Sequence, residues 1–310
     1  LDHRGPDNNQ FYIYSKHINN ICLIHNRLSI LDLEERSNQP FHFENYILIF
    51  NGEIFNYIEI KVILTKLGHH FHTESDTEVL AHALFEWGDQ ALEKLEGMWS
   101  FAWYNKNTND LFLSRDRFGE KPLYFLKTKE GIYFASEIKA IIALSGLKLD
   151  LNMQHIFRYL VNGYKSINKV NEEYYKGIKR IEPGTINKID KDFNLNTFKY
   201  WDPKYVIDEK ISYQDAVSNV KEILINAVKI RMRSDVPIAF CMSGGIDSNS
   251  LISIAKNVLD YGVHGFTIVN TDKRYEEYNL IKESVDYLNI KHTELYLDKT
   301  NFLENLTEQI

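Results

Sequence analysis

The sequence predicts two domains of different class, an α+β domain followed by an α/β domain with a parallel sheet. Up to about residue 145, short runs of Val, Ile, Tyr, Phe and Trp alternate with turn residues, and two helical patterns interrupt them. From about residue 211, strand-like and helical patterns alternate strictly, which is typical of a parallel sheet with helices on both faces. The 310 residues are enough for two separate cores.

The first domain, residues 1–200, is expected to form layered sheets and helices. Strands are expected at 11–14, 21–25, 46–50, 99–104, 110–114, 123–126 and 132–135. The helices at 57–67 and 76–87 each carry an apolar face and stop at Gly68 and Gly88. A further helix is expected over 150–170 and further strands over 177–201, and Pro203 marks a linker.

The second domain, residues 211–310, opens with a helical stripe of Val217, Val220, Leu224, Ala227 and Val228. A strand at 236–242, a helix at 248–258, a strand at 263–269, a helix at 275–288 and a strand at 292–297 follow. The pattern stops at Ile310 partway through, and the chain opens on Leu1 without a preceding element. We therefore expect a fragment whose second domain is truncated.

Composition limits the classes of partner. The net charge is −7, whereas a surface that coats nucleic acid needs a basic footprint. No apolar run approaches the roughly 18 residues of a membrane span, and no secretory signal opens the chain. The two cysteines, Cys22 and Cys241, lie in apolar runs and are expected to be buried thiols in a reducing compartment. We expect a cytoplasmic protein that binds neither nucleic acid nor membrane.

The stretch Ala239 to Ser250, AFCMSGGIDSNS, predicts an anion site. It lies between a strand and the next helix, where open parallel sheets bind ligands. Glycines let a ligand approach the backbone N–H groups, and the helix beginning near Asp247 adds its positive end. The spacing fits neither the Walker A loop nor the G-x-G-x-x-G loop. A plain tight turn with an N-cap is the alternative.

The segment Ser243-Gly-Gly-Ile-Asp-Ser248 resembles the pyrophosphate loop of the ATP pyrophosphatase family, which cleaves ATP between the α- and β-phosphates. This resemblance implies that Ser243, Gly244, Gly245 and Ser248 hold pyrophosphate and that Asp247 helps to place Mg²⁺. Met242 and Ile268 match positions that hold adenine, with ordinary core residues as the alternative. ATP and Mg²⁺ are the cofactors implied.

Several pieces of the first domain together resemble the class II glutamine amidotransferases. They are HRGPD (3–7), HNRLSILD (25–32), FNGEIFNY (50–57), SDTEVL (75–80), RDRFGEKPLYF (115–125) and FASEIKAI (134–141). The resemblance implies an N-terminal-nucleophile hydrolase fold, an αββα sandwich. The downstream loop implies that the second domain is an α/β ATP-pyrophosphatase domain. With both domains taken together, the whole chain resembles the glutamine-hydrolysing asparagine synthetases of the bacterial type.

The same resemblance assigns a glutamine pocket. The side-chain amide of Asn51 and the N–H of Gly52 would stabilise the oxyanion that forms during glutamine hydrolysis. Arg27 would bind the α-carboxylate of glutamine through its planar fork, and Asp76, with Glu53 nearby, would bind the α-ammonium. The backbone around Leu28, Ile30 and Leu31 would line the pocket.

Other interpretations remain open for these residues. Arg27 could form a surface salt bridge, Asp76 could only cap a helix, and Asn51-Gly52 could form a type I′ turn. His3 and Arg4 are expected to brace their loop. The remaining histidines, His69, His70, His72 and His82, lack the spacing of a metal site and are expected to be solvated or structural.

The family's nucleophile is an N-terminal cysteine whose α-amine serves as the base, and residue 1 here is Leu. Cys22 has no free amine and lies in a strand-like run, so it is not expected to replace that nucleophile. The chain as it stands is therefore expected to carry the pocket without its attacking group.

The function implied for the intact protein is glutamine-dependent asparagine synthesis. Glutamine would be hydrolysed to ammonia, ATP would adenylate the β-carboxylate of aspartate, and ammonia would displace AMP. Glutamine, aspartate and ATP are the expected ligands, with a homodimer as the expected assembly. The alternatives are an enzyme that acts on another carboxylate, such as a sugar uronic acid or a peptide precursor, and a non-catalytic binding protein.

Overall fold

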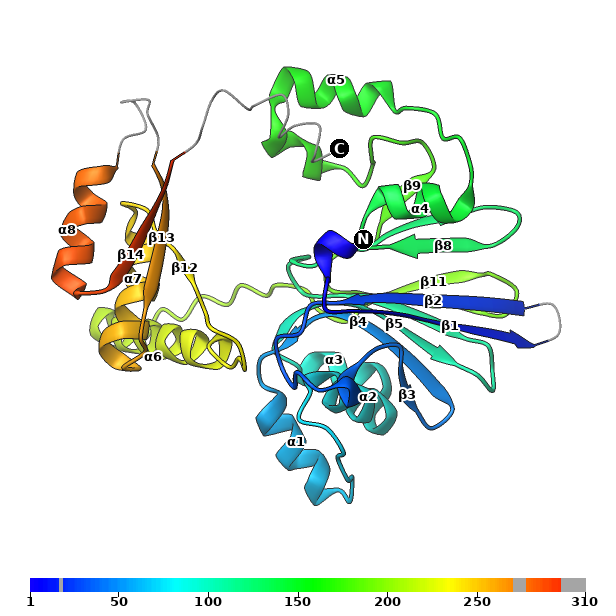
Figure 1. The fold of residues 1–310 in the computed structure, drawn as a ribbon, viewed down its shortest axis with the longest axis horizontal. Helices are drawn as coiled ribbons and strands as arrows, with labels where there is room; N and C mark the ends of the chain where they lie inside the picture. The colour runs from blue at the N-terminus through cyan, green and yellow to red at the C-terminus, as the bar shows by residue number, and fades with distance from the viewer. Residues whose placement is uncertain (17–18, 270–276, 297–310) are drawn as a thin grey trace. The chain divides into compact units, whose positions relative to one another are not determined.

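The computed structural model describes residues 1–16, 19–269 and 277–296, which form two compact units, Leu1–Val206 and Ile207–Ile310 (Figure 1). The first unit holds three sheets. Strands β1 (Asn8–Lys16) and β2 (Asn19–Arg27) form an antiparallel ribbon. A six-stranded sheet has the order β11-β10-β6-β5-β4-β3, and a three-stranded sheet has the order β8-β7-β9.

The bounds of these strands follow the runs of β-branched and aromatic residues. They are β3 Phe41–Phe43, β4 Tyr46–Ile54, β5 Gly97–Asn105, β6 Leu111–Arg115, β7 Tyr124–Lys127, β8 Ile132–Ala135, β9 Ile178–Arg180, β10 Thr185–Ile189 and β11 Leu195–Lys199. The helices of this unit are α1 Tyr57–Lys66, α2 Asp76–Trp87, α3 Ala91–Lys94, α4 Ile138–Ser145 and α5 Met153–Asn162.

Alternation along β4 divides the core into two layers. Leu48 and Phe50 pack with α1, α2 and α3 in one buried cluster. Ile47 and Ile49 face the opposite side, where they pack with Leu23 of the ribbon and with residues of the three-stranded sheet. A separate cluster around Ile141 joins α4 to the outer face of that sheet. The order helix, sheet, sheet, helix is the predicted αββα sandwich, which is confirmed.

Two expectations in this unit were inexact. The helix expected over 150–170 ends at Asn162, because Gly163 has a positive φ of 72° that closes α5. A 3₁₀ segment, Tyr164–Lys169, follows it. Helix α4 was not predicted, since its sequence IKAIIALS is apolar on nearly every side and lacks a clear helical stripe.

The second unit contains a parallel sheet in the order β12-β13-β14, as predicted. Its strands are β12 Phe240–Cys241, β13 His264–Val269 and β14 Lys291–Tyr296. Its helices are α6 Tyr213–Arg231, α7 Ile246–Ser253, which continues as a π-helical turn over Ile254–Val258, and α8 Tyr278–Leu288. Residues 275, 276 and 297 of the predicted elements lie outside the described residues.

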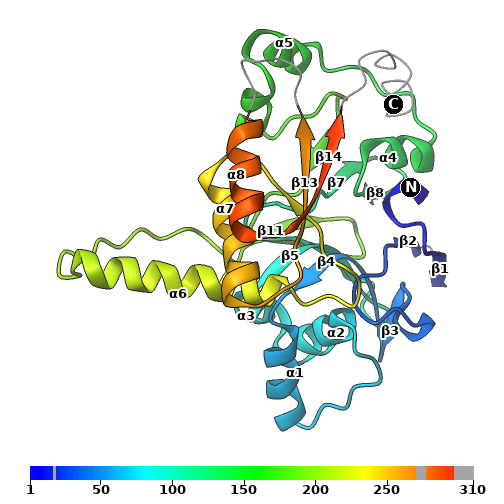
Figure 2. The ribbon, with the colours of Figure 1, turned by 60° about the vertical axis from the view of Figure 1, so that its left-hand side comes forward.

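The arrangement of helices in this unit differs from the prediction. One buried cluster contains Ile252 of α7, Ile281 of α8 and Met242. Both helices therefore cover the same face of the sheet, and Figure 2 shows them on one side of β13 and β14. Consecutive parallel strands that lie side by side give this result, because each crossover has the same hand. The strand expected over 236–242 is reduced to two residues, since Pro237 has no N–H to donate.

The prediction of two buried thiols was wrong, because Cys22 and Cys241 are both exposed. Cys22 precedes the fully buried Leu23 and so points to the other face of the β1–β2 ribbon. Cys241 lies between Phe240 and Met242, which face the helices. In each case the apolar run contains a strand, and the described residues cover only one of its two faces.

Candidate functional site

Asn51 and Glu53 lie on β4 on the side between the two sheets of the sandwich. They share the parity of Ile47 and Ile49, which pack into the core between the sheets. Asn51 pairs with Ser100 of β5, and the β4–β5 ladder continues to Ile54. The Asn51-Gly52 pair is thus strand and not a hairpin turn, which removes that alternative.

Gly52 is required by its neighbour strand. A Cβ on Gly52 would lie 2.1 Å from the carbonyl oxygen of Met98 and 2.8 Å from the Cα of Trp99. The carbonyl of Trp99 accepts from the N–H of Asp116 at 2.9 Å, and the Trp99 N–H donates to the Asp116 carboxylate at 3.3 Å. Trp99 is therefore engaged on its β6 side, and the opposing Gly52 N–H faces away from β5.

The outer edge of β4 shows where that N–H points. Alternate residues of a strand direct their N–H groups to the same edge. The Phe50 N–H donates to the side-chain oxygen of Gln39 at 2.6 Å, and the Ile54 N–H donates to Asp76 Oδ2 at 2.8 Å. Gly52 lies between these two positions, and its N–H has no partner among the described residues. It is a donor directed to the side of β4 on which Asp76 lies.

Asp76 is a buried carboxyl without an ion-pair partner in the described part of the chain. It is the first residue of α2, and the N-cap is Ser75, so the capping alternative does not apply. The pKa of Asp76 is raised from 3.8 to about 7, mainly by burial and in part by the charge of Glu53, while hydrogen bonds from Ile54, Ser75 and Thr77 oppose the rise. Burial also raises the pKa of Glu53, which Lys121 partly opposes. Two neighbouring carboxyls of this kind disfavour each other's ionised form, and a cation placed beside them would oppose that effect.

Arg27 ends β2 and is only 6% exposed, so it does not form a surface salt bridge. Its Nη1 donates to the carbonyl of Glu34 at 2.9 Å and to Asn38 Oδ1 at 2.8 Å. Its Nη2 donates to the carbonyls of Leu31, at 3.2 Å, and Asp32. The terminal N–H groups thus hold the loop that follows β2, and a bound carboxylate would have to replace some of these carbonyls.

The loop after β2 contains the other residues expected to line the pocket. Leu28 is exposed, Ile30 is half-buried and Leu31 is buried. Asp32 ties this loop to the α2 side through the Glu74 N–H, which donates to Asp32 Oδ2 at 2.7 Å. Arg27, Leu31 and Asp76 are therefore joined through a continuous set of hydrogen bonds.

Three residues near these groups had not been singled out. Ser136 accepts from the Asn51 side-chain Nδ2 at 3.4 Å, and Gln39 and His25 contact the Phe50 peptide. Ser136 and His25 lie within motifs that had been recognised as a whole, FASEIKAI and HNRLSILD, whereas Gln39 lies outside the recognised motifs. The motifs of Ser136 and His25 were recognised from the sequence, but the partner of each side chain can be identified only from the three-dimensional structure.

Of the other histidines, His3, His69 and His82 have side-chain partners, and His70 and His72 are exposed. His3 lies 2.9 Å from Glu137, which Arg4 also contacts at 3.3 Å, so both brace the segment beside Ser136. His69 Nδ1 lies 2.7 Å from His82 Nδ1, and His69 Nε2 lies 2.9 Å from Glu86. The described residues contain no group of His, Cys, Asp and Glu able to hold a metal ion.

Hydrogen-bond donors of the SGGIDS loop in the second unit are bound to acceptors of the same chain. The Ser243 N–H donates to Ser248 Oγ at 3.3 Å, and the Gly245 N–H donates to Ser243 Oγ at 3.2 Å. The Gly244 N–H donates to a carboxylate oxygen of Glu277 at 2.8 Å. Helix α7 begins at Ile246, directly after the loop. The Gly244 N–H of the loop therefore already donates to an anionic group, as N–H groups at a helix N-terminus often do.

The residues expected to contact the rest of the nucleotide differ in how far they are exposed. Asp247 is exposed in the first turn of α7, where its carboxylate is accessible. Met242 is buried in the cluster between sheet and helices, which matches the core alternative for its side chain. Ile268 is 61% exposed near the end of β13 and is free to contact a ligand.

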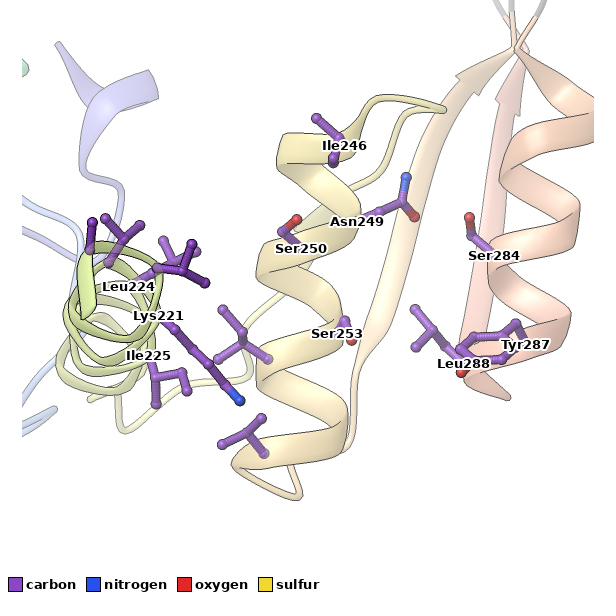
Figure 3. Close-up of a pocket in the computed structure, with 15 residues that line it drawn as sticks. Lys221, Leu224, Ile225, Ile246, Asn249, Ser250, Ser253, Ser284, Tyr287 and Leu288 are labelled. Carbon is purple, nitrogen blue, oxygen red and sulfur yellow. The ribbon is translucent and has the colours of Figure 1, made fainter. Parts of the chain in front are cut away.

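A groove of about 740 Å³ lies between α6, α7 and α8 (Figure 3). Its lining is mainly apolar, with Val220, Leu224 and Ile254 among its residues, and it contains Ile246 and Asn249 next to the loop. None of the residues expected to bind ATP lines it. Separately, no helix among the described residues is long and apolar enough to cross a membrane.

Comparison with protein families gives two matches. Residues 1–201 match the model of a glutamine amidotransferase domain, and residues 219–310 match that of asparagine synthase. Glutamine-hydrolysing asparagine synthetases 1 and 3 of Bacillus subtilis are 32% and 34% identical, over 98% and 82% of this chain. A Methanocaldococcus jannaschii protein, provisionally named glutamine-hydrolysing asparagine synthetase 2, is 32% identical over 98% of this chain.

The chain spans 47%, 41% and 61%, respectively, of the length of these three relatives. Among solved structures, the glutamine phosphoribosylpyrophosphate amidotransferase of B. subtilis is 16% identical, with a TM-score of 0.42 over 93% of this chain and 56% of that one.

Proposed function

The chain belongs to the glutamine amidotransferases of the asparagine synthetase type, and on this premise we propose that the intact protein makes asparagine from aspartate, ATP and glutamine. The first unit would hydrolyse glutamine and release ammonia. The second would use ATP to adenylate the β-carboxylate of aspartate, and ammonia would then displace AMP.

One observation carries the glutamine half of this proposal. The unpaired N–H of Gly52 lies on the β4 edge between the Phe50 peptide and the Asp76 carboxyl. The proposed oxyanion donor and the proposed site for the α-ammonium would thus lie along one edge of β4, and a preorganised donor of this kind stabilises the oxyanion. Asn51 would supply the second donor through its Nδ2, and Glu53 would share the α-ammonium. Arg27 would bind the α-carboxylate of glutamine, and some of its hydrogen bonds to the loop carbonyls would be replaced by bonds to this carboxylate.

The SGGIDS loop supports the ATP half. Ser243, Gly244, Gly245 and Ser248 supply N–H and hydroxyl donors in the loop directly before α7. An exposed carboxylate together with substrate phosphates is the usual environment of Mg²⁺, so Asp247 fits the role of ligand. When bound, the ion would neutralise the phosphate charge. Ile268 and the backbone at Met242 would contact the base.

Ammonia would have to pass between the sites without entering bulk water. In water it is protonated to unreactive ammonium, and the acyl-adenylate is hydrolysed, so exclusion of water protects both reactants.

The experiment is to express the full-length protein and measure pyrophosphate release with aspartate, ATP and Mg²⁺, with and without glutamine. Release that depends on aspartate and glutamine, with asparagine formed, is the expected result. Glutamine hydrolysis without turnover of aspartate would assign the enzyme to another acceptor carboxylate. An absence of glutamine hydrolysis would overturn the amidotransferase assignment.

A further inference from the structure

The Phe50 peptide, one residue before Asn51, is held by two side chains where a neighbouring strand would be expected. Strand β3 pairs with β4 only as far as Leu48. Beyond that point Gln39 Nε2 donates to the Phe50 carbonyl at 3.1 Å, and the Phe50 N–H donates to Gln39 Oε1 at 2.6 Å. His25 Nε2 lies 3.1 Å from the same carbonyl oxygen. The side-chain amide of Gln39 thus continues the ladder by one step.

This arrangement determines whether the backbone N–H of Gly52 is left without a partner strand. If β3 continued alongside β4, its backbone would pair with the outer edge of Gly52 and consume its N–H. Because a side chain replaces the strand, the pairing stops at Phe50. The next outward N–H along β4 is that of Gly52, and the one after it is bound to Asp76. The two side chains therefore end the ladder directly before the proposed oxyanion donor.

The hydrogen bond to Phe50 fixes the state of His25. A carbonyl oxygen only accepts, so Nε2 must carry the proton and Nδ1 the lone pair. Nδ1 is buried and has no partner among the described residues. The pKa of His25 is lowered to about 4, mainly by burial and in part by the charge of Arg27, while the hydrogen bond to Phe50 opposes the fall. The imidazole is neutral at neutral pH and adds no charge beside Arg27.

We propose that His25 and Gln39 are positioning residues for glutamine hydrolysis, which orient the Asn51 and Gly52 donors by jointly holding the Phe50 carbonyl. The inference rests on the proposed glutamine hydrolysis. Neither side chain is required to touch the substrate. Two bonds to one oxygen fix the plane of the Phe50–Asn51 peptide, and hence the direction in which Asn51 leaves the backbone. Oxyanion donors stabilise the developing charge only from a heavy-atom distance of about 2.7–3.1 Å, so a small tilt of the peptide lowers the rate.

The test compares His25→Asn with His25→Gln in the full-length protein. The amide nitrogen of Gln reaches the position of Nε2 and can still donate to Phe50, whereas that of Asn reaches only the position of Nδ1. We expect His25→Asn to lower kcat for glutamate release by about 10- to 100-fold while KM changes less than about threefold. His25→Gln is expected to keep kcat within about threefold of the wild type.

The dissociation constant of L-glutamate, measured by calorimetry, is the control. Glutamate needs the α-carboxylate and α-ammonium sites but no oxyanion donors, so its affinity should be unchanged in both variants. If His25→Asn does not fold, Gln39→Glu provides the second arm, because it keeps the acceptor for the Phe50 N–H and removes the donor to the Phe50 carbonyl. It should show the same loss of kcat at constant KM.

Three results would overturn the inference: an unchanged kcat in the folded variants, a rise of KM with kcat intact, or equal losses in the Asn and Gln variants. If the wild-type protein hydrolyses glutamine and the variants match it, only the positioning role fails. If the wild-type protein hydrolyses no glutamine, the proposed function and this inference fail together.

Discussion

At the scale of single residues, Asp76 shows how a residue of a proposed binding site can lower the stability of its own fold. Its carboxyl is buried beside Glu53, and its pKa is raised from 3.8 to about 7. The folded protein therefore holds this proton more tightly than the unfolded chain does. The stability gained from the protonated form is complete below about pH 4 and is lost as pH rises towards 7, by about 1.4 kcal/mol per pH unit.

Asp76→Asn is expected to remove this loss, because an amide stays neutral and its oxygen can still accept from the Ile54 N–H. Unfolding by urea, followed by tryptophan fluorescence at pH 5 and pH 8, should show a smaller fall of the free energy of unfolding in the variant. Glutamine binding should be lost at both values. Asp89→Asn, at an exposed position, is the control and should keep the wild-type pH dependence. A variant that is less stable than the wild type at pH 8 would contradict this account.

Gly52→Ala tests the close approach of β4 and β5. The new methyl group would lie 2.1 Å from the Met98 carbonyl oxygen, so the two strands must separate. We expect a loss of about 3 kcal/mol or more in the free energy of unfolding, measured by circular dichroism during urea titration. Gly262→Ala, where an added Cβ meets nothing within 4 Å, should change stability little. Equal effects of the two substitutions would show that β4 and β5 can separate without a loss of free energy of unfolding.

The residues of the proposed glutamine pocket illustrate how much of a site can be predicted from the sequence. Motifs identified Arg27, Asn51, Gly52 and Asp76 because the residue types match the chemistry. The proposed roles of His25, Gln39 and Ser136 could not be predicted, since each depends on a contact between separate segments of the chain. The bonding of Arg27 to loop carbonyls was missed for the same reason.

At the scale of elements, predictions succeeded where a periodic pattern met a clear stop. Helix α2 runs over Asp76–Trp87, as expected, because an acidic first turn and Gly88 bound its apolar face. Helix α4 was missed because its apolar residues surround the helix. The two-residue strand β12 and the placement of α7 and α8 on one face depend on pairing between strands, which local pattern does not contain.

Glu277→Gln tests the contact between the N-terminal end of α8 and the SGGIDS loop. The Glu277 carboxylate occupies the Gly244 N–H, which a phosphate group of ATP would need. Removing its charge should favour ATP by about 1 kcal/mol at low salt, or about fivefold in the dissociation constant. Calorimetric titration with ATP and Mg²⁺ measures this change. Glu283→Gln, an exposed position on the same helix, is the matched control. Weaker binding by Glu277→Gln would mean that the carboxylate builds the cradle and does not compete for it.

At the scale of the whole molecule, an extended segment joins the two units. Tyr205, Val206 and Ile207 are 92%, 88% and 85% exposed and lie outside helices and strands. Exposed chain of this kind is where proteases cut first. Lys204 and Lys210 offer sites for trypsin, and Tyr205 offers one for chymotrypsin.

Brief digestion of the 310-residue chain should therefore cut between about residues 204 and 210 before any other place. Mass spectrometry identifies the cut, and fluorescence tests the first unit, which holds all four tryptophans. The emission spectrum should not change on cleavage, because that unit has its own cores. Early cleavage within residues 1–200, or a red shift on cutting the linker, would show that the first unit is not independent.

The two exposed cysteines give the chain a natural pair of labelling positions. Cys22 lies in the first unit and Cys241 in the second, and they are the only cysteines of the 310 residues. Maleimide dyes attached to them would report the separation of the units by energy transfer, without an engineered thiol. Cys241 also lies two residues before Ser243. Its alkylation rate should fall when ATP is bound, so one native thiol offers a simple footprint of the nucleotide.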